Sequence, residues 1–473
     1  VSNCKVLMKK NDLITAVVAK IGSNGEGVVK IDDTACFVPF ALIGEKVVFK
    51  VLKVNKNVAY CKLIEVLAPS EDRVRPLCQF FTKCGGCQLQ HTKLKNQLNI
   101  KRNIISDCFK KIANLNVLVS PVVKSDTEYY YRNKIQLPIR STSNGNKIGF
   151  FYENSHRIIE IDECVIQKPF ATEIIKAFNE FISKTNVSCY NDEFNSGLLK
   201  HVVAKSVKDA YLVIVVINGK ELPFVELLIK ILSKYFKKFS LIINENTLNN
   251  NVILGDKFNL VFGPNCYYNE ISGIKYPVYP ESFSQVNDYI KTKLYQNVVK
   301  QLNITSESVV IDAYSGAGLM TAMIALNAKK AIGIEIVNEA VLSANELAKI
   351  NNLSDKMVNI CAPCELVLPE IIEKEKQNGS IISVVLDPPR KGVDQKVLNA
   401  ILKAMPNKIV YVACSPQSLA RDVGVLVGSL KWVNGQLIRV EGYTPNYVIE
   451  SVIPYDMFPQ TKHIETLVVL NRN

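Results

Sequence analysis

The most constraining feature of this sequence is a set of short, β-branched apolar runs that end at chemically useful residues. Residues 309–312 lead into a glycine turn, residues 384–387 end on a carboxylate, and residues 408–414 end on a thiol. Runs this apolar predict strands that are buried on both faces of a parallel sheet. Open sheets of this kind bind ligands outside the carboxyl ends of their strands. We therefore predict an α/β, doubly wound, Rossmann-like domain with an active site at that edge.

The glycine turn favours S-adenosyl-L-methionine over a dinucleotide. It reads Asp312-Ala-Tyr314-Ser-Gly316-Ala-Gly318, so the third glycine of a dinucleotide fingerprint is missing. An acid that opens the turn would repel a pyrophosphate, whereas it suits a cationic ligand. Glu335 ends the next apolar run, where a carboxylate can bind two ribose hydroxyls. The alternative is that the two glycines only permit a tight turn.

The strand end at Asp387 and the thiol of Cys414 indicate which atom receives the methyl group. In amino-methyltransferases an aromatic residue follows Asp-Pro-Pro, but here Asp387-Pro-Pro is followed by Arg390. Carbon 5 of a pyrimidine is a poor nucleophile until a thiolate adds at carbon 6. Cys414 facing a sulfonium site therefore points to pyrimidine carbon methylation, although a buried cysteine taken alone is more often structural.

Five motifs between residues 283 and 466 resemble those of the RNA uracil-5-methyltransferases, in the order typical of that family. These enzymes make 5-methyluridine in 23S ribosomal RNA or transfer RNA. The motifs are Phe283-Ser-Gln285-Val-Asn287, Asp312-x-Tyr-Ser-Gly-x-Gly, Asp387-Pro-Pro-Arg390, Tyr411-Val-Ala-Cys414-Ser-Pro416 and Asp456-Met-Phe-Pro-Gln-Thr-Lys-His463-Ile-Glu465-Thr.

The resemblance implies Cys414 as the nucleophile and Glu465 as the base that removes the proton on carbon 5. Two positions depart from the family pattern. Leu319 stands where many relatives carry a polar residue, and Pro363 falls near the usual adenine-contacting polar position. The residues that the resemblance implies around the methyl donor are Gln285, Tyr314, Glu335 and Asp387.

A cluster of cysteines gives a second signal. Cys78-x5-Cys84-Gly-Gly-Cys87 places three thiols close together, and Cys164 is a plausible fourth ligand. Four thiolates suit zinc or an iron–sulfur cluster equally well by donor set. The resemblance favours a [4Fe-4S] cluster, because the ribosomal RNA branch carries one on this pattern; zinc comes next and disulfides last. We expect a structural or RNA-organising role.

The chain length of 473 residues predicts about three domains. Residues 1–67 contain short alternating runs that predict an OB-like β-barrel, which resembles the TRAM domain and is rich in lysine. A small packing domain with solvated lysines is the alternative. Residues 68–275 should form a central α+β iron–sulfur domain, with the helix at 89–113 as a candidate to pack on the catalytic domain. Residues 276–473 should form the methyltransferase domain.

Within these domains we predict helices at residues 170–184 and 285–302, with the former as the one clear helix between 120 and 270. The last strand, residues 465–470, should be the antiparallel insertion common to the fold. The aromatic and basic residues of segment 129–134 suit an RNA-facing surface, although the tyrosines could equally be strand core.

The net charge of +13 favours a polyanionic partner, with a merely lysine-rich composition as the alternative explanation. No apolar run approaches membrane-helix length and no signal-peptide pattern is visible, so we expect no membrane partner and a cytoplasmic location. Thirteen cysteines without an evident pairing framework fit a reducing compartment. We expect a monomer acting on RNA, with 23S rRNA favoured over transfer RNA. Two competing functions are RNA cytosine-5-methylation and non-catalytic RNA binding by an iron–sulfur protein.

Overall fold

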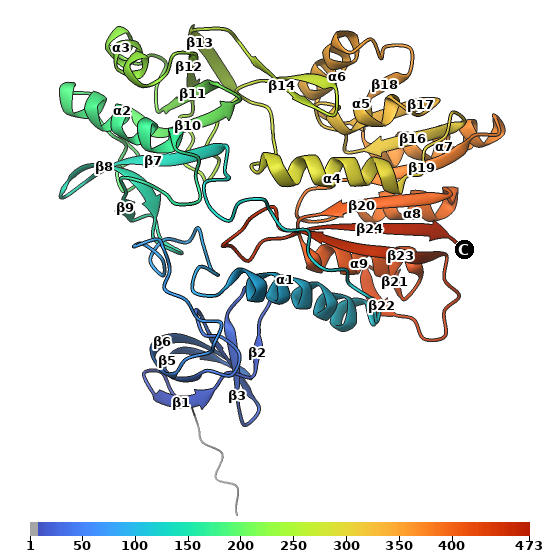
Figure 1. The fold of residues 1–473 in the computed structure, drawn as a ribbon, viewed down its shortest axis with the longest axis horizontal. Coiled ribbons are helices and arrows are strands. Elements are labelled where there is room, and N and C mark those ends of the chain that lie inside the picture. The colour runs from blue at the N-terminus through green and yellow to red at the C-terminus, as the bar shows by residue number, and fades with distance from the viewer. Residues whose placement is uncertain (1–7) are drawn as a thin grey trace, which may run out of the picture.

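The computed structural model describes residues 8–473; the first seven residues of the predicted 1–67 domain lie outside the described part. The described chain forms three large sheets that follow one another along the sequence (Figure 1). Among residues 8–473, no helix is both long enough and apolar enough to cross a membrane.

The first large sheet has six strands in the order β1-β5-β6-β4-β3-β2. Alternating residues of β5, such as Val47, Phe49 and Val51, are fully buried in a small core of their own. The hydrogen-bonded order runs from β1 to β2 without closing, so the closed OB-like barrel stays a prediction. The strands are β1 Leu13–Val17, β2 Lys20–Ile21, β3 Gly27–Ile31, β4 Thr34–Val38, β5 Lys46–Asn55 and β6 Val58–Ala68.

An irregular segment that contains Cys78, Cys84 and Cys87 leads to helix α1 (Leu94–Cys108), which continues into a π-helical turn, η1 (Phe109–Ala113). The helix predicted from residue 89 therefore starts five residues later. Leu89 instead donates its N–H to the carbonyl of Gln460 at 3.0 Å, which holds the chain out of a helix. Ile105 of α1 lies in the same hydrophobic core as the strands of the last sheet. The helix runs alongside that sheet (Figure 1).

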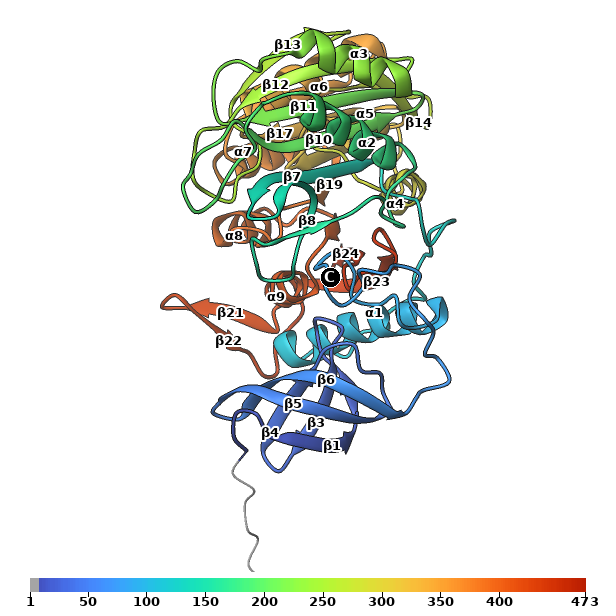
Figure 2. The same ribbon diagram turned by 90° about the vertical axis from the view of Figure 1, so that its left-hand side faces the viewer.

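The second large sheet has seven strands in the order β13-β12-β11-β10-β7-β8-β9, and helices α2 and α3 lie on one of its faces (Figure 2). Strand β11 is apolar on both sides because its two faces enter different cores: Val213 packs under the helices, whereas Ile214 lies in a core that it shares with strands of the third sheet. The prediction of one clear helix was wrong, since α3 also forms. The elements are β7 Lys134–Thr142, β8 Gly145–Phe151, β9 Ile158–Glu160, α2 Phe170–Lys184, β10 Leu199–Val207, β11 Ala210–Ile217, α3 Val225–Tyr235, β12 Phe239–Glu245 and β13 Lys257–Phe262.

The third large sheet has the order β18-β17-β16-β19-β20-β24-β23. Strands β18 to β20 are parallel, and β24 runs antiparallel to both of its neighbours, β20 and β23. The chain leaves β16 towards one edge and returns to the other side through β19, which creates a switch point between them. The predicted doubly wound α/β sheet with an antiparallel last strand is therefore present. Its elements are β16 Ser308–Ala313, α5 Leu319–Ala325, β17 Lys330–Glu335, α6 Asn338–Ile350, β18 Met357–Cys361, α7 Cys364–Gln377, β19 Ile381–Leu386, α8 Gln395–Ala404, β20 Lys408–Ala413, α9 Pro416–Val427, β23 Tyr447–Tyr455 and β24 Glu465–Arg472.

Two hairpins and one helix complete the chain: β14 (Tyr267–Ile271) with β15 (Ile274–Val278), β21 (Leu430–Val433) with β22 (Gln436–Arg439), and α4 (Asp288–Gln301). The helix predicted from residue 285 starts at Asp288, because Asn287 has an extended backbone and its side chain accepts the N–H of Ile290. This cap leaves Gln285 in the irregular segment before the helix.

Candidate active site

The glycine turn after β16 is shaped by backbone conformation and by close packing. Tyr314, Gly316 and Gly318 all have positive φ, of 68°, 53° and 79°. A side chain at Gly318 would approach Ala344 and the methyl group of Met357 to 2.7 Å, so this position requires glycine. The turn therefore brings its backbone close to helix α6 and to the first residue of strand β18.

Two acids flank this turn. Asp312 is 2% exposed and accepts a hydrogen bond from the Thr321 hydroxyl at 2.6 Å, and burial raises the pKa of its carboxyl to about 7. Glu335, at the end of β17, accepts the Gly316 N–H at 3.0 Å. Its other oxygen accepts the N–H groups of Ile336 and Val337. The carboxylate of Glu335 is thereby fixed at the edge of the turn.

Asp387 follows β19 directly, and its low-polarity surroundings raise the pKa of its carboxyl to about 7. Side chains of helix α9 hold the loop that follows Asp387. Asp422 accepts the Tyr411 hydroxyl at 2.7 Å and the Val393 N–H at 2.8 Å, while Ser418 donates to the carbonyl of Arg390 at 3.1 Å. A buried carboxylate thus fixes the loop that carries Asp387.

Cys414 and Glu465 meet at the ends of neighbouring strands. The antiparallel register pairs Ala413 with Thr466, which brings Cys414, just after β20, beside Glu465, the first residue of β24. Burial raises the pKa of the Cys414 thiol to about 11; Glu465 and Asp387 raise it as well, whereas Arg390 lowers it. Burial, and then Asp387, hold the pKa of Glu465 well above its usual range. A thiol, two acids and one guanidinium therefore share one electrostatic environment.

Gln285 lies in the segment before α4 and is 7% exposed. Its carbonyl accepts a hydrogen bond from the side chain of Asn133 at 3.2 Å, which joins this segment to the central domain. Phe283, two residues earlier, is 81% exposed. Of the two departures from the family pattern, Leu319 begins α5 and Pro363 directly precedes α7.

Sequence reasoning missed Tyr295 of α4. Burial, followed by the nearby carboxylates of Asp387, Asp312 and Glu465, raises the pKa of the Tyr295 hydroxyl well above its ordinary value. Tyr295 therefore lies where the acids of three different strands converge. No motif contains it, and helical spacing alone would identify it only as a residue on the inner face of α4.

The four cysteines Cys78, Cys84, Cys87 and Cys164 line one cavity of about 390 Å³ in the central domain. Burial raises the pKa of Cys87 to about 12 and of Cys164 to about 11, and their neighbouring thiols add to both shifts. In the described residues, no group of three or more His, Cys, Asp or Glu side chains has an arrangement that could hold a metal ion. Cys164, which is distant in sequence, does join the others, but the cluster itself stays a prediction.

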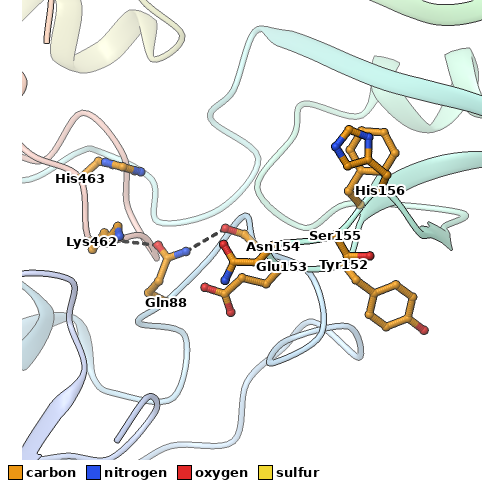
Figure 3. A pocket seen from close by; sticks show the side chains of 10 residues that line it. Gln88, Tyr152, Glu153, Asn154, Ser155, His156, Lys462 and His463 are labelled. Carbon is orange, nitrogen blue, oxygen red and sulfur yellow. Dashed lines mark hydrogen bonds between the residues drawn. The ribbon is translucent and has the colours of Figure 1, made fainter. Parts of the chain in front are cut away.

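A second, more open cavity of about 550 Å³ lies between residues 78–88, which we call the cysteine loop, the turn after β8 and the segment before β24 (Figure 3). Its walls include Gln88, the residues from Tyr152 to His156, and Lys462 with His463. Burial and nearby cations, Arg390 first, lower the pKa of His463 to about 4, so this imidazole is neutral at physiological pH. His463 does not act as a cation beside Glu465.

Comparisons with known proteins agree with this geometry. A model of the tRNA (uracil-5-)-methyltransferase family matches residues 269–473, and a TRAM domain model matches residues 10–64. An uncharacterized RNA methyltransferase of Clostridium tetani is 38% identical over 466 residues, which are 98% of this chain and 97% of that protein. One from Clostridium acetobutylicum is 37% identical over 471 residues, 98% of each.

A solved structure is also similar over the whole chain. It is the crystal structure of Pyrococcus abyssi tRNA (uracil-54, C5)-methyltransferase in complex with S-adenosyl-L-homocysteine, with a TM-score of 0.74 and 25% identity. The match covers 97% of this chain and 100% of that one. The chain, with its TRAM domain and α/β methyltransferase sheet, therefore belongs to the S-adenosylmethionine-dependent RNA (uracil-5-)-methyltransferase family.

Proposed function

We propose that this protein methylates carbon 5 of a uridine in 23S ribosomal RNA through a covalent adduct with Cys414. The observation that carries the proposal is the meeting of Cys414 and Glu465 at adjacent strand ends, beside Asp387 and the glycine turn. A thiol for addition and a carboxylate for proton removal are the two groups that carbon-5 methylation needs.

In the proposed reaction, the Cys414 thiolate adds to carbon 6 of a uracil that has left the RNA stack. The electron pair of the 5,6 double bond becomes available at carbon 5, which takes the methyl group from the sulfonium of the donor. S-adenosylhomocysteine leaves. Glu465 then accepts the proton that remains on carbon 5, and the double bond forms again as the thiolate departs.

The perturbed acidities support these roles. A carboxylate with a raised pKa is a stronger base once it is ionised, which suits Glu465 for removing a carbon-bound proton. Arg390 lowers the pKa of the Cys414 thiol and therefore favours the reactive thiolate against the opposing acids. Asp387 is proposed to orient the uracil and the donor's amino group.

The donor is proposed to bind across the glycine turn. Glu335 would accept hydrogen bonds from its ribose hydroxyls, and the fixed position of this carboxylate supports that role. Gln285 and Tyr314 would contact the methionine end. The buried acids around Tyr295 favour a ligand with positive charge, as a sulfonium has.

We also propose that Cys78, Cys84, Cys87 and Cys164 hold a [4Fe-4S] cluster. The shared cavity and the four-thiol donor set support this proposal, because clusters of this type are bound by four thiolates. Burial first, and then the neighbouring thiols, raise the pKa of Cys87 and Cys164, and binding of an iron centre would favour their thiolate forms. The cluster would supply a structural cross-link and no chemistry to methyl transfer.

The choice of 23S rRNA rests on the cysteine pattern and the TRAM domain, which resemble the ribosomal RNA branch of the family. Transfer RNA is the second candidate, because the solved structure that matches the whole chain is a tRNA (uracil-54, C5)-methyltransferase. We further propose that the enzyme acts as a cytoplasmic monomer and that the lysine-rich residues 1–67 help to bind the RNA.

The test is mass mapping of 5-methyluridine in 23S rRNA and transfer RNA from a deletion strain and from the same strain complemented with the gene. We expect one or more 23S sites to lose the modification and to regain it on complementation. Loss in transfer RNA alone would refute the ribosomal substrate. Loss in neither RNA would refute the proposed function.

A further inference from the structure

The segment that delivers Glu465, residues 456–464 between β23 and β24, has no regular secondary structure. Its fixed points are side chains from other parts of the chain. Asp456 forms a fully buried ion pair with Lys101 at 2.5 Å, and the carbonyl of Pro459 accepts the Tyr131 hydroxyl at 3.0 Å. The conformation of this segment therefore depends on groups more than 300 positions earlier in the sequence.

Gln460 lies at the middle of the segment, is 1% exposed and has a positive φ of 69°. Its N–H donates to the side-chain oxygen of Gln97 at 3.1 Å, and the Gln97 amide donates back to the Gln460 side chain at 2.9 Å. Because Gln97 is equally buried, removing it leaves a buried backbone N–H without its partner. Gln97 thus holds a backbone conformation that a non-glycine residue seldom adopts.

Gln88 makes a second connection, directly after Cys87. The Gln88 side chain donates to the carbonyl of Gly85 at 2.8 Å and accepts the N–H of Lys462 at 3.3 Å (Figure 3). The backbone N–H of Gln88 also donates to the carbonyl of Gln460 at 3.2 Å. The cysteine loop and the segment before Glu465 are therefore hydrogen-bonded to each other on both sides of Thr461.

We infer that Gln97 and Gln88 are positioning residues for Glu465. They fix segment 456–464, and this segment determines how the chain enters β24 and where the Glu465 carboxylate points. The inference rests on the proposed function, in which Glu465 removes the proton on carbon 5. Through Gln88, the cysteine loop would then contribute to catalysis by holding the segment that carries Glu465 in place.

If Gln97 and Gln88 position Glu465, replacing them should slow product release and leave the earlier steps, thiolate addition and methyl transfer, unchanged. Formation of the methylated adduct needs Cys414 and the donor, whereas release of the product needs the base. Misplacing a base by about 1 Å costs roughly 10²-fold in rate. Gln97→Ala and Gln88→Ala should therefore slow release about 10- to 100-fold and let the methylated adduct accumulate on ordinary uridine RNA.

The experiment is a single-turnover reaction of the full-length protein with uridine-containing RNA and methyl-labelled donor, quenched in denaturant. Labelled protein–RNA adduct and labelled free RNA are measured over time for the wild type, Gln97→Ala, Gln88→Ala and Glu465→Gln. Asn96→Ala is the matched control, because Asn96 is on the same helix and donates to Thr92. We expect this control to behave as the wild type.

Adduct that accumulates in both glutamine variants, at near wild-type formation rates, would support the inference. Equal slowing of adduct formation and release in both variants, or wild-type release, would overturn it. If Gln97→Ala unfolds, Gln88→Ala decides the matter, since Gln88 is only half-buried. Failure of Glu465→Gln to accumulate adduct would overturn the proposed role of Glu465, and this inference with it.

Discussion

The acidity of the Cys414 thiol can be tested without any RNA. Its pKa of about 11 means that a fraction of about 10⁻³ is thiolate at pH 8, against about 0.2 for an ordinary cysteine with a pKa of about 8.5. Since the thiolate is the reactive form, iodoacetamide should label Cys414 roughly 200-fold more slowly than a cysteine in an unstructured peptide at pH 8. Labelling should increase with pH up to about 11.

Two substitutions test the direction in which neighbouring charges shift the pKa of Cys414. Glu465→Gln removes a charge that raises the thiol pKa, so labelling of Cys414 should accelerate and its pH profile should move to lower pH. Arg390→Gln removes the charge that lowers the pKa and should do the opposite. Labelling at Cys414 is measured by peptide mass spectrometry. A profile centred near pH 8 that neither substitution moves would refute the electrostatic reasoning.

Three further predictions concern the donor, the fold and the cluster. Glu335→Ala should weaken donor binding by about 1.5–3 kcal/mol in calorimetry and leave RNA affinity unchanged, because charge-assisted bonds to the ribose are lost; unchanged donor affinity would contradict this. Lys101→Met leaves the Asp456 carboxylate buried and unpaired and should lower the free energy of unfolding in urea by about 3–5 kcal/mol, whereas a change below about 1 kcal/mol would contradict it. Anaerobically purified protein should absorb broadly near about 400 nm, and Cys84→Ser or Cys87→Ser should bleach it; a colourless wild type with one zinc per chain would exclude the cluster.

The parts of the site that sequence could predict are those carried by strand ends. Apolar runs identify buried strands, and residues that follow them in a parallel sheet share one edge, which is why Asp387 and Cys414 come together. Glu335 follows from the same reasoning on β17. Glu465 follows from the family resemblance, and the antiparallel register of β24 then brings it next to the thiol.

Other parts depend on contacts between distant segments. The helix predicted from residue 89 starts later because Leu89 is bound by Gln460, and no local pattern contains that information. Helix α3 was missed because its apolar run lacks a clear start signal; Phe224 before it has a left-handed backbone and no capping side chain. Tyr295 comes under the electrostatic influence of the acids only through the tertiary packing of α4, so periodicity assigns it to the core and nothing more.

The central claim is that Cys414 forms a covalent bond to the substrate, and a 5-fluorouridine RNA tests it most directly. After methyl transfer, fluorine occupies the place of the proton on carbon 5, so no base can release the product. We predict a methylated protein–RNA adduct that survives denaturing electrophoresis, maps to Cys414 and is absent in Cys414→Ala. A wild-type enzyme that methylates uridine RNA but forms no such adduct with the fluorinated RNA would contradict the account.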